Sequence, residues 1–284
     1  EAQRIQVLMT LKNLSEKPEE RVRAAAAFGA IGAHLTEAQR TEVLMTLKNI
    51  SQDADDDVRA AAAAAFGALG AHLTVAQRTQ VLTTLNDLAE NSEERARAAA
   101  ARAVAAIPVH LTEAQCAQVF TTLKKLSEDS NDAVRAAAAA AVAATFVHMT
   151  EATRTQVFTT LKNLYEDSSD AVRASAVAAV AATFVHMTEA QRTQAFTTLK
   201  NLSENSQERV PAAATATAAA LAEIFVHLTE PQRMQAFTTV KNLSEKSEGR
   251  VHAAAALGAI GVRVTDVQAM GAHLTEDQCC QVVN

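Results

Sequence analysis

Apolar and polar positions alternate along the chain with the period of amphipathic helices. In segment 43–50 the apolar residues fall at i, i+1, i+4 and i+7, so they share one stripe of a helix. The same spacing returns in segments 119–126 and 157–164. A polar, acidic stretch such as 127–132 follows, and then an alanine-rich segment such as 134–147. The pattern predicts pairs of helices that are joined by short polar turns.

The string His-Leu-Thr or His-Met-Thr recurs at regular intervals. It begins at His34, His72, His110, His148, His186, His227 and His273. The first four gaps are 38 residues each, and the last two are 41 and 46. Two antiparallel helices cannot bury both of their apolar stripes alone, whereas stacked neighbours can, so this period predicts an all-α solenoid. We expect a single repeat domain over 1–284, divided into helix pairs at 1–35, 36–73, 74–111, 112–149, 150–187, 188–228 and 229–274, with a partial unit at 275–284.

The helix ends are marked by capping residues. Thr-x-x-Gln capping boxes open the first helices at Thr36, Thr74, Thr112 and Thr188, whereas Thr150 is followed by Thr153 and predicts a weaker box. Acidic residues before the second helices suit the positive end of the helix dipole. In the first and second repeats, Gly32 and Gly70 lie near the end of the second helix, where we expect a left-handed cap residue.

The regular pattern breaks in the last repeats. Pro211 cannot lie inside a helix, so the second helix of the sixth repeat is expected to begin close to Val210. In the seventh repeat Gly249 and His252 replace an acid–arginine pair. Either Thr265 or Thr275 can cap the last helix. The chain stops at Asn284 within an unfinished apolar stripe, so we expect a fragment of a longer protein.

The second helices carry a recognisable signature. Asp56–Arg59 is followed by Ala60–Ala65 and then by Gly67–Gly70, and the acidic start recurs at Asp132–Arg135 and Asp170–Arg173. This signature resembles the HEAT-type repeats of the HEAT/armadillo α-solenoids. The resemblance implies a right-handed solenoid whose second helices line the concave face. Members usually work as scaffolds or adaptors, although a few HEAT-like proteins are DNA-repair glycosylases or pigment-attaching lyases.

The composition narrows the range of partners. A net charge of −6 and a pI near 5.8 argue against nucleic acid or an anionic membrane. No apolar run is long enough to span a bilayer. The three cysteines are too few for a disulfide framework or a zinc site, which fits reduced thiols in the cytoplasm. Cys116 and Cys279 take a position that is arginine in other repeats, so we expect both to be exposed.

Two kinds of polar residue recur in register. Acid–arginine pairs spaced i, i+3 can touch within one helical turn, and they stand at Glu20–Arg23, Asp56–Arg59, Glu94–Arg97, Asp132–Arg135 and Asp170–Arg173. We favour a structural role for these pairs, and the alternative is a row that binds an acidic partner through Arg23, Arg59, Arg97, Arg135 and Arg173. The histidines are too widely spaced to share a zinc ion and are expected to be turn residues.

The function that fits best is a protein–protein interaction scaffold. Segment 134–147 offers only Arg135 and Thr145 as polar side chains, so second helices on a concave face would form an alanine-rich trough for a partner helix or peptide. The alternative for this segment is burial by neighbouring repeats. The alternatives for the whole chain are a self-associating repeat array and a nucleic-acid-binding solenoid. No clustered acid–base set stands out, so neither an enzyme, a cofactor nor a metal is expected.

Overall fold

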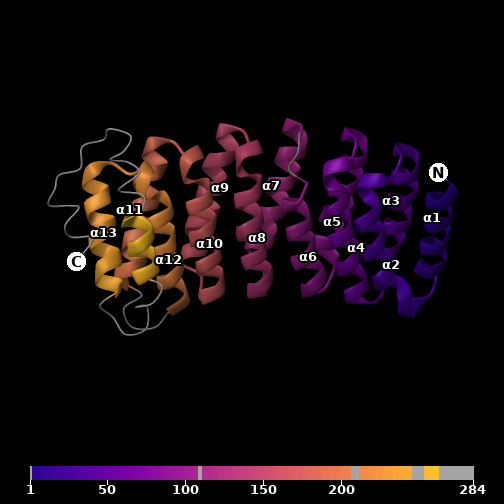
Figure 1. The fold of residues 1–284 in the computed structure, drawn as a ribbon, viewed down its shortest axis with the longest axis horizontal. Coiled ribbons are helices and arrows are strands. Elements are labelled where there is room, and N and C mark those ends of the chain that lie inside the picture. The colour runs from indigo at the N-terminus through magenta and orange to yellow at the C-terminus, as the bar shows by residue number, and fades with distance from the viewer. Residues whose placement is uncertain (1, 108–110, 206–210, 245–252, 262–284) are drawn as a thin grey trace. The chain divides into compact units, whose positions relative to one another are not determined.

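The computed structural model describes residues 2–107, 111–205, 211–244 and 253–261, and this part of the chain contains helices and no strand (Figure 1). The first helices of successive repeats are α1 (Ala2–Ser15), α3 (Glu37–Ile50), α5 (Val75–Asn91), α7 (Glu113–Ser127), α9 (Glu151–Tyr165), α11 (Glu189–Asn205) and α13 (Glu230–Ser244). The second helices are α2 (Arg21–Ile31), α4 (Asp56–Leu69), α6 (Glu94–Ala105), α8 (Asp132–Thr145), α10 (Asp170–Thr183) and α12 (Pro211–Ile224). A further helical segment covers 253–261.

The chain divides into two compact units, Glu1–Thr160 and Leu161–Asn284. In the N-terminal unit, α2, α4, α6 and α8 pack side by side in one row, and α3, α5 and α7 form the other row. In the C-terminal unit, α10 packs against α12, and α12 also contacts α11 and α13. The prediction of one continuous repeat domain over 1–284 stays a prediction.

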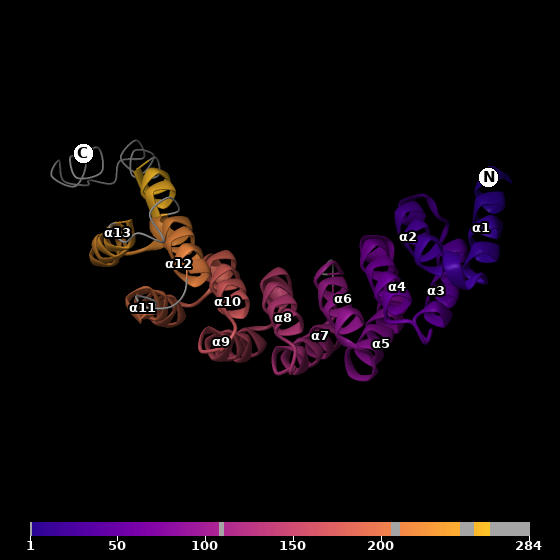
Figure 2. The same ribbon diagram turned by 90° about the horizontal axis from the view of Figure 1, so that it is seen from below.

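Small residues set the spacing of the second helices. A Cβ atom on Gly29 would lie 3.1 Å from the Cα of Ala65, and one on Gly67 would lie 3.0 Å from the Cα of Ala103. Alanine and glycine therefore let neighbouring second helices approach closely, whereas the larger side chains of the first helices keep those helices further apart. As the resemblance implies, the second helices of the N-terminal unit lie on the inner side of its curve (Figure 2).

The apolar stripes of both helices form the core between repeats. Val43, Leu44, Leu47 and Ile50 of α3 are all buried. The repeats place a buried aromatic ring at one of two positions, and α6 has none. In α4 the ring is Phe66, with Gly70 one turn later, whereas after α8 Val142 stands at the first position and Phe146 at the second.

The predicted caps of the first helices are confirmed. In α3, α5 and α7 the threonine hydroxyl accepts from the glutamine amide at 3.3 Å, and the glutamine side chain accepts from the threonine amide at 3.0 Å. The same two bonds join Thr188 and Gln191. At Thr150 the hydroxyl accepts from the Thr153 amide at 3.3 Å, and the two hydroxyls lie 2.9 Å apart. In the other boxes a glutamine side chain accepts from the threonine amide. The Thr150 box has no such reciprocal bond, as its sequence predicts.

The expected left-handed caps at Gly32 and Gly70 are wrong. Their φ angles are −51° and −49°, which is ordinary right-handed helix, and each glycine opens a 3₁₀ turn that ends at a histidine. Glycine is needed here for close packing. A Cβ atom on Gly70 would lie 2.7 Å from Cγ1 of Ile107 and 3.1 Å from the Ala106 carbonyl oxygen.

The second helix of the sixth repeat begins at Pro211, as predicted, and its 14 residues match the length of α10. Proline is favoured at the first position of a helix because its missing N–H would have no partner there. The extra residues of this repeat therefore lie before the helix. The features noted at Gly249, His252, Thr265 and Thr275 lie outside the described residues.

Candidate partner-binding surface

The second helices of the N-terminal unit expose a stripe of small residues opposite their buried stripe. In α4, Val58, Ala62 and Phe66 are buried, whereas Ala64 and Ala68 are exposed. The same positions are exposed on the neighbouring helices and on the 3₁₀ turns that follow them. We call this set the alanine surface: Ala26, Ala30, Ala33, Ala64, Ala68, Ala71, Arg102, Ala106, Ala140, Ala144 and Val147. Neighbouring repeats therefore do not cover it.

The chemistry of the alanine surface is that of exposed methyl groups. Arg102 is its only charged member, and at the equivalent position the other helices carry Ala26, Ala64 and Ala140. In the C-terminal unit, α10 exposes the corresponding Ala178 and Ala182. Small side chains leave the helix backbones accessible, so an approaching helix or strand can come close without displacing protein atoms.

The predicted partner-binding arginines other than Arg23 brace the turns before their own helices. Arg59 Nη1 donates to the carbonyl oxygens of Asp53 at 2.8 Å and Ala54 at 2.9 Å. Arg135 repeats this pattern with Asp129 at 2.8 Å and Ser130 at 2.9 Å. Carbonyl groups in a short turn lack backbone partners, and the guanidinium supplies them.

Arg173 braces its turn in the same way by donating to the carbonyl oxygens of Asp167 and Ser168. The predicted i, i+3 pairs of Asp56 with Arg59 and of Asp170 with Arg173 are also formed in these turns. Arg59 lies 2.8 Å from Asp56, and Arg173 lies 3.3 Å from Asp170.

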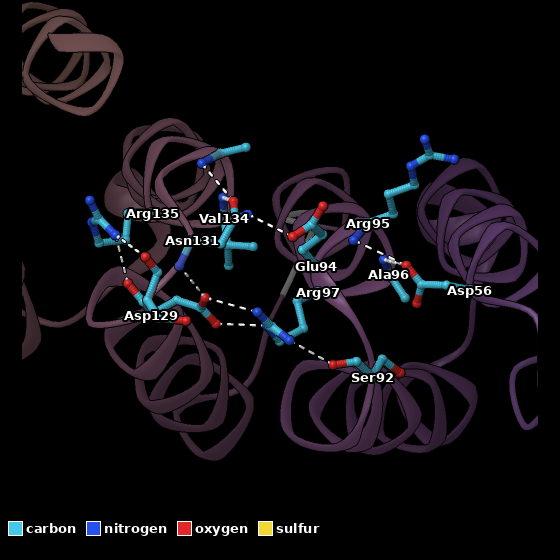
Figure 3. Close-up of polar contacts among 12 residues, drawn as sticks. Asp56, Ser92, Glu94, Arg95, Ala96, Arg97, Asp129, Asn131, Val134 and Arg135 are labelled. Atoms are coloured by element: carbon cyan, nitrogen blue, oxygen red, sulfur yellow. Dashed lines mark hydrogen bonds and ion pairs between the residues drawn. The ribbon is translucent and has the colours of Figure 1, made fainter. Parts of the chain in front are cut away.

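Other arginines join one repeat to the next. Arg97 donates to both carboxylate oxygens of Asp129, at 2.7 and 3.0 Å, and to the Ser92 carbonyl oxygen at 2.7 Å (Figure 3). Arg21 makes the equivalent ion pair with Asp53. The Asp53 carboxylate accepts a backbone hydrogen bond from Asp55, and this bond together with the Arg21 contact lowers the pKa of Asp53.

The structure corrects the register of the arginine row in the first repeat. Arg21, and not Arg23, is the equivalent of Arg59, because each precedes a buried phenylalanine by seven residues. The side chain of Arg23 is 81% exposed and lies 3.4 Å from Glu20. The similar strings Glu-Arg-Val-Arg and Asp-Asp-Val-Arg suggested the wrong alignment, whereas the distance to Phe28 gives the right one.

A partner-binding role for Arg23, Arg59, Arg97, Arg135 and Arg173 stays a prediction. The contacts fit the structural alternative, since Arg59, Arg97 and Arg173 have mostly buried side chains that are engaged by the protein itself. Arg23 differs from these three because its guanidinium faces solvent.

Sequence reasoning missed several polar contacts between repeats. Nε2 of the capping glutamine Gln77 also donates to Thr41 Oγ1 of the preceding repeat at 2.9 Å, and Gln115 does the same with Thr79. Oδ2 of Asp56 accepts from two amides in the first turn of α6, those of Arg95 and Ala96, at 3.1 and 3.2 Å (Figure 3). The N-cap residue of α6, Glu93, makes no side-chain cap, so one repeat caps the helix of the next.

Comparison with known proteins identifies the fold. No protein-family model and no curated protein matches the sequence. Among solved structures, Kap121p is similar over 90% of this chain, with a TM-score of 0.66 and 14% identity, and the match spans 30% of Kap121p. Kap121p bound to Ste12p gives a TM-score of 0.65 at 14% identity, with 90% of this chain and 29% of that chain covered. An engineered protein is 22% identical, with 76% of this chain and 98% of that chain covered and a TM-score of 0.52. The chain has the HEAT/armadillo α-solenoid fold.

The expectation that Cys116 is exposed is wrong. Cys116 is buried, with 3% of its surface exposed, and its Sγ donates to the His148 carbonyl oxygen at the end of the same repeat at 3.1 Å. Arg4 occupies the equivalent place in α1 and donates to the His34 carbonyl oxygen at 2.9 Å. The thiol therefore makes a bond that elsewhere comes from a guanidinium. Burial, with a smaller contribution from Glu113, raises the pKa of Cys116.

The remaining recurring residues take structural positions in the solenoid. His34, His72, His148, His186 and His227 are exposed and end the 3₁₀ turns after the second helices, as predicted. Adjacent threonines recur in the first helices at 83–84, 121–122, 159–160 and 197–198. The first member of each pair is exposed, and the second is buried at Thr84, Thr122 and Thr160. Within the described ranges no cluster of three or more metal-binding side chains occurs. None of the described helices combines the length and the hydropathy that spanning a bilayer requires.

Proposed function

We propose that this solenoid is a protein-interaction scaffold that binds a helix or an extended peptide of a partner protein on its alanine surface. The observation that carries the proposal is the exposure of Ala26, Ala64, Ala68, Ala140 and their neighbours on the second helices. These helices lie on the inner side of the N-terminal unit (Figure 2). A mostly apolar surface on the inner side of a curve offers more contact to an elongated partner than a flat surface does.

The physical basis is close approach. Alanine methyl groups contribute apolar contact area to a complex. Binding costs no side-chain conformational entropy at these positions, because alanine has no rotamers to immobilise. Arg102 is the charged side chain within the stripe, whereas Asp57, Glu94 and Asp132 lie at the starts of the second helices, beside the stripe. A partner segment can therefore pack along the stripe without desolvating these three carboxylates. The solved complex of Kap121p with Ste12p, which has a similar fold, is consistent with this use of the architecture.

The experiment compares two double variants in affinity purification from nuclease-treated source-cell lysate. In one variant Ala64→Arg and Ala68→Arg obstruct the alanine surface. In the matched control Thr83→Arg and Thr121→Arg add the same charge to exposed positions of α5 and α7. We expect a protein that the parent chain and the control retain and the alanine-surface variant loses. A bound protein lost from the control instead would assign the interaction to the first helices and contradict the proposal.

A further inference from the structure

Arg102 of α6 is the charged residue within the alanine surface, and it lies between repeats on both sides. α6 packs between α4 and α8. At the position of Arg102 these two helices carry Ala64 and Ala140, and both alanines are exposed. The exposed guanidinium of Arg102 is therefore surrounded by small apolar side chains of its own unit.

The Arg102 side chain has no acidic neighbour on its own helix. Side chains three and four positions apart are neighbours on a helix, and around Arg102 these positions hold Ala98, Ala99, Ala105 and Ala106. The nearest acidic residue of α6, Glu94, lies eight residues earlier, about 12 Å along the helix axis. Its carboxylate already accepts from Asn131 Nδ2 of the next repeat at 2.9 Å (Figure 3). Within the part of the chain that the structure describes, the Arg102 guanidinium makes no hydrogen bond or ion pair.

The other two arginines of α6 have partners within the protein. Arg95 pairs with Asp57 at 2.6 Å, and Arg97 pairs with Asp129 at 2.7 Å. Both carboxylates belong to adjacent repeats, so these two arginines hold repeats together. Arg102 makes no contact of this kind, although it lies on the same helix.

The position of Arg102 sets a requirement for any segment that binds the alanine surface. A segment that covers the methyl groups around Arg102 also removes water from its guanidinium. Taking a charge out of water without an opposite charge is costly, whereas a carboxylate can accept two parallel N–H bonds from the guanidinium. These bonds are stronger where apolar surface excludes water. The ligand must therefore combine an apolar contact side with one negative charge.

We propose that the partner segment on the alanine surface carries one Asp or Glu side chain whose carboxylate pairs with Arg102 and fixes the register of the segment. The carboxylates of Asp57, Glu94 and Asp132 lie beside the surface and repel an acidic residue that is placed near them. Arg102 is then the place on the surface where an acidic residue is favoured. This inference rests on the proposed function, since it names the chemistry of the partner at the same surface.

The test selects displayed random peptides on the immobilised 284-residue chain and measures the affinity of each winner by fluorescence anisotropy. A winner is assigned to the alanine surface if the double variant Ala64→Gln and Ala68→Gln, which obstructs the surface without adding charge, weakens its binding. We expect these winners to share one acidic residue among apolar ones. Selection on Arg102→Glu should replace that acidic residue by Lys or Arg.

A double-mutant cycle tests the contact itself. Arg102→Ala, which restores the alanine of α4 and α8, should weaken the winners about tenfold, the loss of a charge-assisted hydrogen bond. Changing the acidic residue of the peptide to its amide should weaken binding to the parent chain by a similar factor and should have little effect on Arg102→Ala. Circular dichroism of Arg102→Ala should match the parent, because the exposed side chain has no partner to lose.

Arg95→Ala is the matched control, because it removes the same charge from an exposed position at the start of the same helix. It should change the affinity of the winners by less than about twofold. The inference alone is overturned if winners assigned to the alanine surface bind Arg102→Ala as tightly as the parent chain, or if Arg95→Ala weakens them as much as Arg102→Ala does. If no winner is weakened by the Ala64 and Ala68 changes, the proposed function is overturned and this inference with it.

Discussion

Arg97 and Asp129 belong to consecutive repeats and meet in a two-point ion pair, with Nε and Nη2 of Arg97 at 2.7 and 3.0 Å from the carboxylate oxygens. Arg97 also donates to the Ser92 carbonyl oxygen in the turn before its own helix. One side chain therefore stabilises the turn of its own repeat and binds the next repeat.

Replacing Arg97 by Ala should lower the free energy of unfolding by about 1–3 kcal/mol, because it leaves a mostly buried carboxylate and a turn carbonyl without their donor. Arg23→Ala is the matched control, since the 81% exposed Arg23 side chain should contribute less than about 1 kcal/mol. Urea denaturation followed by circular dichroism measures both. Equal losses for the two variants would contradict the role given to Arg97.

Val43 and Val7 occupy the same helical position and differ in burial, which makes them a stability test of repeat stacking. Val43→Ala should cost about 1.5–3 kcal/mol, the value of a fully buried valine, and Val7→Ala less than half as much. Thermal unfolding of the two variants gives the comparison. A Val7→Ala variant that loses as much stability as Val43→Ala would contradict this difference in burial.

Gly70 and Gly258 test the packing of glycine in the second helices. Gly70→Ala should destabilise the chain, because the new Cβ would lie 3.1 Å from the Ala106 carbonyl oxygen and 2.7 Å from Ile107 Cγ1. Gly258→Ala should be neutral or stabilising by up to about 1 kcal/mol, since nothing lies within 4 Å of its Cβ position and alanine is the better helix former. Melting temperatures of both variants decide the matter, and a stabilising Gly70→Ala would refute the close approach.

Asp53 makes stability depend on pH in one direction. Its pKa is lowered from the ordinary 3.8 by the Asp55 amide and the Arg21 guanidinium, so its contribution is full above pH 3.8 and is lost as pH falls through the lowered pKa. The difference in unfolding free energy between the parent chain and Asp53→Asn should therefore be constant near neutral pH and shrink below about pH 4. Denaturation between about pH 6 and about pH 2.5 measures it. A difference that widens in acid would reverse the assignment.

Cys116 should be a slow thiol. Burial removes it from reagents and raises its pKa, so little thiolate forms at neutral pH. In a background with Cys279→Ser and Cys280→Ser, the reaction with a disulfide reagent should be many-fold slower in the native chain than in denaturant. Similar rates in the two states would show that the thiol is exposed after all, as its sequence position first suggested.

Local features of this chain could be predicted from sequence, and contacts between repeats could not. The capping box at Thr36 and the helix start at Pro211 depend on neighbouring residues and were read correctly. The bond from Cys116 to His148 joins residues far apart in sequence within one repeat, and the bond from Gln77 to Thr41 depends on a neighbouring repeat. The period says which residues are equivalent, but it does not say which of them face the adjacent unit.

The register error at Arg23 has the same origin. A short motif aligned it with Arg59, whereas the buried Phe28, fixed by packing, aligns Arg21 instead. The alanine surface was foreseen as a trough, but only the structure decided between an open surface and one that its own helices cover.

The most direct test of the scaffold is site-specific photocrosslinking. A photoreactive phenylalanine analogue is placed at Ala68 or Ala106 on the alanine surface, and at Thr83 or Thr121 on the first helices as controls. We expect one partner protein to be crosslinked in lysate from Ala68 and Ala106 and not from Thr83 or Thr121. Crosslinks from Thr83 and Thr121, with none from the alanine surface, would contradict the account.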